Sequence, residues 1–147
     1  MSTYSFLDVN ASIVGPGGSI NLAAGAAVAD EGITIESSED IGSLTIAADG
    51  TPMHNLHANK SGTITVHLLK TSPVNQKLAQ MYALQTAAGS THGQNTISIT
   101  NSNTQDVVTA TSVGFKKAPT ITYAKDGGMN AWTFICGRID RALGSVT

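Results

Sequence analysis

The chain has 147 residues, enough for one domain with a hydrophobic core and too few for two ordinary ones. Only 12% of the residues are charged and the net charge is −2, which excludes a strongly basic nucleic-acid-binding protein and favours a surface covered by other subunits. The single cysteine, Cys136, excludes an internal disulfide, and no apolar run reaches the roughly 18 residues of a membrane span, so we expect a soluble protein without a membrane partner.

Short strands and turns are predicted for the first 30 residues. In residues 4–14, apolar and polar residues alternate, and the alternation shifts by one position along the way. This pattern indicates a first strand with a bulge. The glycine-rich residues 15–18 predict a turn, and residues 19–22 its short partner strand. Residues 23–29 are small and interrupted by glycine, so we expect a loop or arm there.

Two clean alternations follow, at residues 32–37 and 43–47. They place Ile33, Ile35, Leu44 and Ile46 inward, and Thr34, Glu36 and Thr45 outward. An acidic turn with Glu39 and Asp40 separates them. Residues 53–60 have no clear period and are predicted to be a loop that carries His54 and His57.

Residues 62–70 form the strongest strand pattern and would extend about 30 Å. Ser72 and Pro73 then favour a helix start, with Ser72 as the N-cap. Val74, Leu78, Met81 and Tyr82 recur at helical spacing. The sequence therefore predicts one amphipathic helix over residues 73–86.

The rest of the chain returns to strands, at residues 96–101, 106–115 and a hairpin over 119–140 around a Gly-Gly turn. This hairpin is the predicted centre of the core, because it holds the only tryptophan. The expected fold is mainly β, an antiparallel sandwich or barrel with one flanking helix, forming a single domain over residues 1–147. The predicted core residues are Ile33, Ile35, Ile64, Val66, Leu78, Met81, Tyr123, Trp132 and Phe134.

Motifs for chemistry are missing from the sequence. His54 and His57 supply two potential metal ligands, whereas a zinc site needs three or four. Cys136 lies on a strand that is expected to be buried. Glu39 and Asp40 are interpreted as solvated charges in a turn. We expect no enzyme, no cofactor and no metal.

Three long segments carry a resemblance to a known family. They are YSFLDVNASIVGPGG at residues 4–18, LLKTSPVN at 68–75 and FKKAPTITYAKDGGMNAWTF at 115–134. In these segments the chain resembles the inner tail tube proteins of contractile-tailed bacteriophages. The likeness extends over residues 4–143 and involves no catalytic signature.

This resemblance implies a subunit that assembles with itself. Six copies would close into a ring, and stacked rings would form a tube through which phage DNA passes transiently. The implied partners are a tail sheath outside the tube and baseplate and terminator proteins at its ends. The implied location is the virion tail, assembled in the host cytoplasm.

Two sets of residues are candidates for the surfaces of such a tube. A wall of hydroxyl and acidic groups would let DNA slide, whereas lysines would attach it. The lumen-lining candidates are Thr34, Glu36, Glu39, Asp40 and Thr45, with an ordinary solvated sheet face as the alternative. The ring-stacking candidates are Ala24, Gly25, Ala26, Ala27, Asp30, Glu31, His54, His57 and Lys60.

Other readings stay open at this point. The chain would also suit a tube subunit of a related contractile injection system. From different classes, it would suit a small β-sandwich module that binds carbohydrate or a cell surface, or an enzyme with an unrecognised site. The sparse aromatic residues favour burial over an exposed binding platform.

The charged residues are separated along the sequence. Seven of the ten acidic residues precede residue 60, and all eight basic residues follow residue 59. This separation would suit a subunit whose two ends carry opposite charge, and chance is the alternative explanation.

Overall fold

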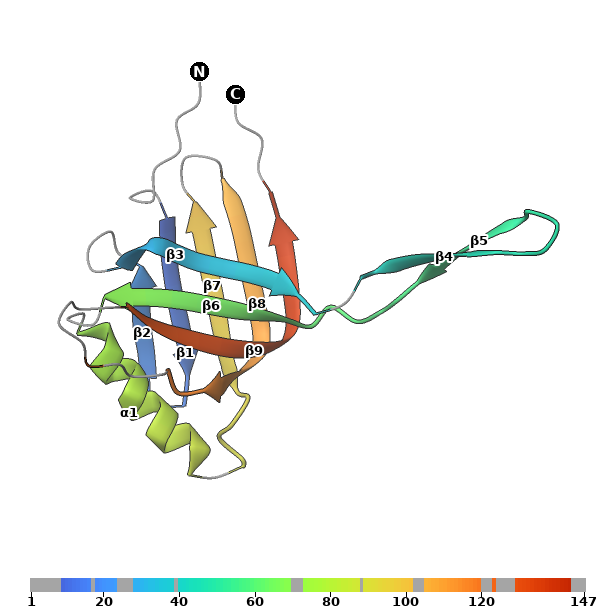
Figure 1. Ribbon diagram of the computed structural model, residues 1–147. Coiled ribbons are helices and arrows are strands. Elements are labelled where there is room, and N and C mark those ends of the chain that lie inside the picture. The colour runs from blue at the N-terminus through green and yellow to red at the C-terminus, as the bar shows by residue number, and fades with distance from the viewer. Residues whose placement is uncertain are drawn as a thin grey trace, which may run out of the picture.

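A computed structural model (Figure 1) describes residues 9–16, 18–23, 28–38, 40–69, 73–87, 89–101, 105–119, 123 and 129–143. In this part of the chain there are nine strands and one helix. The elements are β1 (Val9–Gly15), β2 (Gly18–Ala23), β3 (Val28–Ser37), β4 (Gly42–Ile46), β5 (Pro52–Leu56), β6 (Gly62–Leu69), α1 (Val74–Thr86), β7 (Asn95–Asn101), β8 (Asp106–Lys117) and β9 (Met129–Ala142). No helix in the described ranges is long and apolar enough to cross a membrane.

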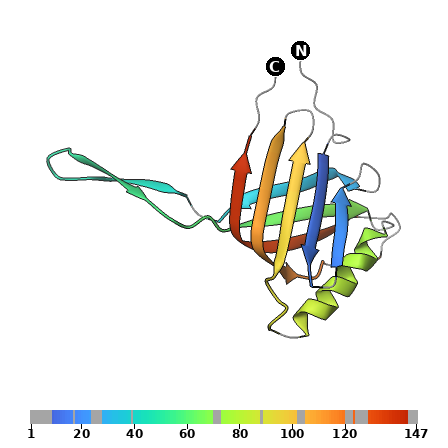
Figure 2. The ribbon, with the colours of Figure 1, turned by 180° about the vertical axis from the view of Figure 1, so that it is seen from behind.

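Seven strands form one antiparallel sheet in the order β2-β1-β7-β8-β9-β6-β3, while β4 and β5 pair only with each other. The sheet curls into two layers because β9 is long: its residues 129–136 pair with β6 and its residues 133–142 pair with β8, so only the middle of the strand has partners on both sides. In Figure 1, β3 and β6 cross in front of a layer formed by β1, β2, β7 and β8, and Figure 2 shows the same layers from the other side. The expected antiparallel sandwich or barrel with a flanking helix is confirmed.

Alternation along the strands sends apolar side chains between the layers. Phe115 lies at the centre of an aromatic cluster, with ring centroids 5.0 Å from Phe134, 5.5 Å from Tyr82 and 6.0 Å from Trp132. The edge-on arrangement of two of these pairs is the favoured geometry for aromatic rings. The Trp132 Nε1–H donates to Asn75 Oδ1 at 2.9 Å, which satisfies the polar end of the indole. The prediction that this part of the chain centres the core is confirmed for Trp132 and Phe134.

The helix packs on the barrel through Leu78, Met81 and Gln85. Gln85 and Asn95 are both fully buried and exchange two amide hydrogen bonds of 2.7 and 2.6 Å. Gln85 also donates to the carbonyl of Pro16 and Asn95 to that of Val113, so one polar network ties α1, the β1–β2 turn, β7 and β8 together. The helix is confirmed, but its N-cap is Pro73 without a side-chain cap, and Ser72 lies outside the described residues.

The other predicted core residues divide into three groups. Ile64, Val66, Leu78 and Met81 are buried, and Ile33 and Ile35 are partly buried against the core. Tyr123 was predicted wrongly: it is 87% exposed and lies outside any strand. In the described residues the second arm of the predicted hairpin, β9, pairs with β6 and with β8, the strand before it in the chain, and Tyr123 of the predicted first arm lies in no strand. Most of its first arm and its Gly-Gly turn lie outside the described residues.

Several strand predictions need correction and others hold. The first strand does carry an irregular register, between Ala11 and Ser12. Residues 53–60, predicted as a loop, include strand β5. Residues 23–29, predicted as a loop, end one strand at Ala23 and begin the next at Val28, while residues 24–27 lie outside the described ranges.

Candidate assembly surfaces

The β4–β5 hairpin projects from the barrel as an arm (Figure 1). Its tip is an ordered turn in which Gly50 has φ +89°, a conformation that favours glycine. The backbone N–H of Thr51 donates to Asp49 Oδ1 at 2.9 Å, and this bond lowers the pKa of the Asp49 carboxyl. The tip is therefore held by its own local hydrogen bonds.

The arm has two unlike faces, set by the antiparallel register that pairs Leu44 with His54 and Ile46 with Pro52. Side chains alternate along a strand, so one face carries both apolar residues of β4. We call this the apolar hairpin face, and its members are Leu44, Ile46, Pro52, His54 and Leu56. Leu44, Ile46 and Leu56 are 54%, 55% and 84% exposed. The inward orientation predicted for Leu44 and Ile46 is wrong within this subunit, because the body supplies no core beneath them.

The opposite hairpin face is mostly polar. It carries Ser43, Thr45, Met53 and Asn55, and the Asn55 amide donates to Thr45 Oγ1 at 3.0 Å. The arm is therefore amphipathic. Strands that cover a hydrophobic core have the same pattern, with an apolar side toward the core and a polar side toward solvent. The described residues of the body do not cover the apolar side of the arm.

Backbone hydrogen bonds join the base of the arm to the barrel. The Ser38 N–H donates to the Ser61 carbonyl at 3.1 Å, and the Ile139 N–H donates to the Lys60 carbonyl at 2.9 Å. Two of the predicted stacking residues lie in or beside this region: His57 follows β5 and Lys60 lies at the base. His54 lies on the apolar hairpin face. The side chains of Asp30 and Glu31, and residues 24–27, lie outside the described residues.

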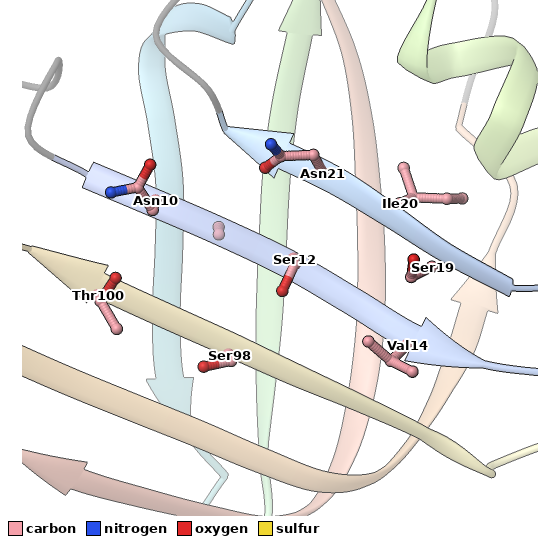
Figure 3. Close-up of a pocket in the computed structure, with 9 residues that line it drawn as sticks. Asn10, Ser12, Val14, Ser19, Ile20, Asn21, Ser98 and Thr100 are labelled. Atoms are coloured by element: carbon pink, nitrogen blue, oxygen red, sulfur yellow. The ribbon is translucent and has the colours of Figure 1, made fainter.

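The first sheet layer presents an outward surface that we call face A. It consists of the exposed or half-exposed side chains of β1, β2, β7 and the first half of β8. Its members are Asn10, Ser12, Val14, Ser19, Asn21, Thr96, Ser98, Thr100, Val107, Thr109 and Thr111. Each is a hydroxyl, amide or valine side chain, and none is charged. An open hollow of about 440 Å³ lies over β1, β2 and β7 on this face (Figure 3).

The second layer presents face B, the outward side chains of β3, β6 and the first half of β9. The paired rows run Thr34–Thr65–Thr133 and Glu36–Thr63–Ile135. The predicted lumen residues Thr34 and Glu36 are exposed on this face. Thr45 lies on the arm and Asp40 on the connection before it, so these residues do not share the single face that the sequence suggested. Glu39 lies outside the described residues.

Among the described residues, no group of three or more His, Cys, Asp or Glu side chains could hold a metal ion. Cys136 is fully buried on β9, and burial raises the pKa of its thiol to about 11. The thiol is therefore a core group rather than an activated nucleophile.

A family comparison decides what kind of protein has these surfaces. The model of the Bacteriophage PhiTE tail tube protein family matches residues 1–144. The chain belongs to this family. The tail tube resemblance found in its sequence is thereby confirmed, and the tail tube protein is a structural component of a tail. A comparison with curated proteins gave no match.

Solved structures confirm the fold of this tail tube protein. One is the anti-feeding prophage cap, a tube-terminating cap, with a TM-score of 0.58, 9% identity, and coverage of 98% of this chain and 93% of that one. A second is a chain of the PVC sheath-tube complex of an extracellular contractile injection system, with a TM-score of 0.58, 9% identity, and coverage of 96% and 92%. A third is from the PVC sheath/tube terminator, with a TM-score of 0.57, 13% identity, and coverage of 97% and 98%. At such low identity the likeness establishes a shared architecture.

Proposed function

We propose that copies of this tail tube protein close into rings of six and that the rings stack into the inner tube of a contractile phage tail, through which DNA leaves the virion. The role is structural and needs no catalysis, cofactor or metal. A sheath surrounds the tube, and baseplate and terminator proteins meet its ends. Assembly takes place in the host cytoplasm, without a membrane.

The apolar hairpin face is the observation that carries this proposal. A two-stranded ribbon is marginally stable alone, and this one exposes three large aliphatic side chains on one side. Covering them would contribute on the order of 1 kcal/mol for each half-exposed side chain. A second copy is the fitting occupant, because the family builds tubes from its own subunits.

An arm that reaches another copy's body makes a head-to-tail contact. Such contacts close into a ring when the rotation between copies closes, and extend without limit when it does not. His54, His57 and Lys60 lie on or near the arm and would touch the next ring. Residues 24–27, Asp30 and Glu31 keep their place as proposed stacking residues.

Charged substitutions on the two hairpin faces test this assembly. The double variant Leu44→Glu with Ile46→Glu places charges on the apolar hairpin face, and Ser43→Glu with Thr45→Glu is the matched control on the polar face. We expect the first variant to keep the wild-type melting temperature but form no tubes in negative-stain electron microscopy, while the control still assembles. Tubes of wild-type length from the first variant would contradict the proposal.

A related function is favoured by the PVC sheath-tube structure, which belongs to an extracellular contractile injection system. In that alternative the same tube would belong to an injection device rather than to a virion. Particles purified with the protein and tested for nuclease-sensitive packaged DNA separate the two. Packaged DNA supports the phage tail, and tailed particles free of DNA support the injection device.

A further inference from the structure

Face A and face B differ in charge, and this inference rests on the proposed tube. On face A, pairing aligns a row of polar side chains across four strands: Asn21, Ser12, Ser98 and Thr109. The row ends at Asp140 of β9, whose carboxylate forms an ion pair with Arg138 Nε at 3.0 Å. Within the described residues, this row therefore ends at a carboxylate that is paired with a side chain of opposite charge.

Face B contains charged side chains at both margins. Its rows end at Glu36 on β3 and, beyond Thr133, at exposed Lys117 of β8. His67 on β6 lies on the same face and is paired with Ala131 of β9. A lysine beside duplex DNA attaches to phosphate and releases counterions, which makes the contact strong and salt-dependent.

The form of face A also suits the inside of a tube. Four strands cross it, and its hollow of about 440 Å³ lies over β1, β2 and β7. Figure 3 shows Ser12 and Ser98 on adjacent strands of that hollow, with Asn10 beside Thr100. No described strand pairs with the outer edge of β2, so the sheet is open there to a neighbouring copy.

We propose that face A is the channel wall of the tube and that this wall is neutral, built from Ser, Thr and Asn side chains that face passing duplex DNA through a layer of water. Hydrogen bonds from hydroxyl and amide groups exchange readily with those of water and contribute only about 0.5–1.5 kcal/mol net. Such a wall neither holds the phosphates nor repels them. The acidic residues first expected in the lumen then lie elsewhere: Glu36 on the outer surface, and Asp40 near the base of the arm.

Two engineered cysteines locate the wall. Ser98→Cys and Thr65→Cys both replace a hydroxyl residue in the middle strand of a polar row, on face A and face B respectively. The native Cys136 is fully buried and gives little background. Tubes are treated with a maleimide on a long polyethylene glycol chain, and dissociated subunits of both variants serve as the labelling control.

We expect labelling at residue 98 to fall at least tenfold on assembly while labelling at residue 65 persists. Ser12→Cys, one strand away, repeats the measurement if the first variant fails to assemble. Reaction at residue 98 in tubes, or equal protection of both sites, overturns the assignment of face A. Failure of the unmodified chain to form tubes is a different result and counts against the proposed function itself.

Charge variants at the same two positions test the neutral wall. Ser98→Lys tubes should retain short duplex DNA at low salt in a form protected from nuclease, and release it as salt rises. Thr65→Lys tubes should bind DNA that nuclease digests, and wild-type tubes should retain none. Nuclease-protected DNA in the Thr65→Lys tubes and not in the Ser98→Lys tubes, or retention by wild-type tubes, overturns the proposal.

Discussion

The barrel body and the β4–β5 arm follow the same alternation of apolar and polar residues and end in opposite environments. In β6 the alternate residues Ile64, Val66 and Leu68 are fully buried. In β4 the alternate residues Leu44 and Ile46 are more than half exposed. The difference shows that a strand pattern specifies which face is apolar and does not specify which surface covers that face.

The largest effect on subunit stability is expected in the body. Phe134 is fully buried against Phe115, so Phe134→Ala should lower the free energy of unfolding by about 3–5 kcal/mol. Leu44→Ala on the arm is the control and should change it by less than about 0.5 kcal/mol. Urea denaturation of dissociated subunits measures both, and equal losses would remove the distinction between body and arm.

Removing a buried amide side chain should likewise lower the free energy of unfolding more than removing an exposed one. Asn95→Ala leaves the buried Gln85 amide without its reciprocal partner, which should cost about 1–3 kcal/mol in the free energy of unfolding. Asn55→Ala removes one exposed bond to Thr45 on the arm, and we expect a change within about 0.5 kcal/mol. Thermal unfolding of the two variants side by side checks this, and a larger loss from Asn55→Ala would contradict it.

A third pair of variants compares stability with assembly. Leu56→Ser should leave the melting temperature of the subunit unchanged, because the side chain is 84% exposed. It should nevertheless raise the protein concentration needed for tube growth, since a neighbour loses apolar contact. Light scattering measures that concentration. Asn55→Ser, on the polar face, is the control, and an equal effect from both would indicate that the apolar hairpin face has no special part.

The smallest effect is expected at the exposed ion pair beside the base of the arm. Hydrogen bonds from Arg138 lower the pKa of the Asp140 carboxyl, and the positive charge of Arg138 adds to this. A lowered folded-state pKa stabilises the fold above the unfolded value of about 3.9 and loses that contribution as pH falls through the folded pKa. An NMR titration of Asp140 should give a midpoint below that of the same carboxyl in Arg138→Gln. No difference between the two midpoints would contradict the pairing.

Local patterns were sufficient to predict much of the body. Alternation located β6 and β7, and helical spacing located α1 with Leu78 and Met81 on its buried face. The pairing of β9 with β6 was missed, because a glycine-rich turn suggested a local hairpin, whereas β6 is distant from β9 in sequence. Distant pairing depends on the whole sheet and leaves little local signal.

The candidate surfaces were predicted less well, for a physical reason. Strand β5 has no strict alternation, since Pro52, His54 and Leu56 share its apolar side, and the interval was read as a loop. Face A was overlooked because Ser, Thr and Asn carry no motif. Its members become one surface only when the sheet register brings β1, β2, β7 and β8 together. The sequence signal that remained was the low charge of the whole chain.

The most direct measurement of the central claim, that this subunit is completed by identical copies, is a cryo-EM reconstruction of the protein assembled at high concentration. We predict a hollow tube in which Leu44 and Ile46 are buried against a neighbouring copy and the neutral row containing Ser98 faces the channel. Monodisperse monomers at the same concentration, or a tube in which the apolar hairpin face stays in solvent, would contradict the account.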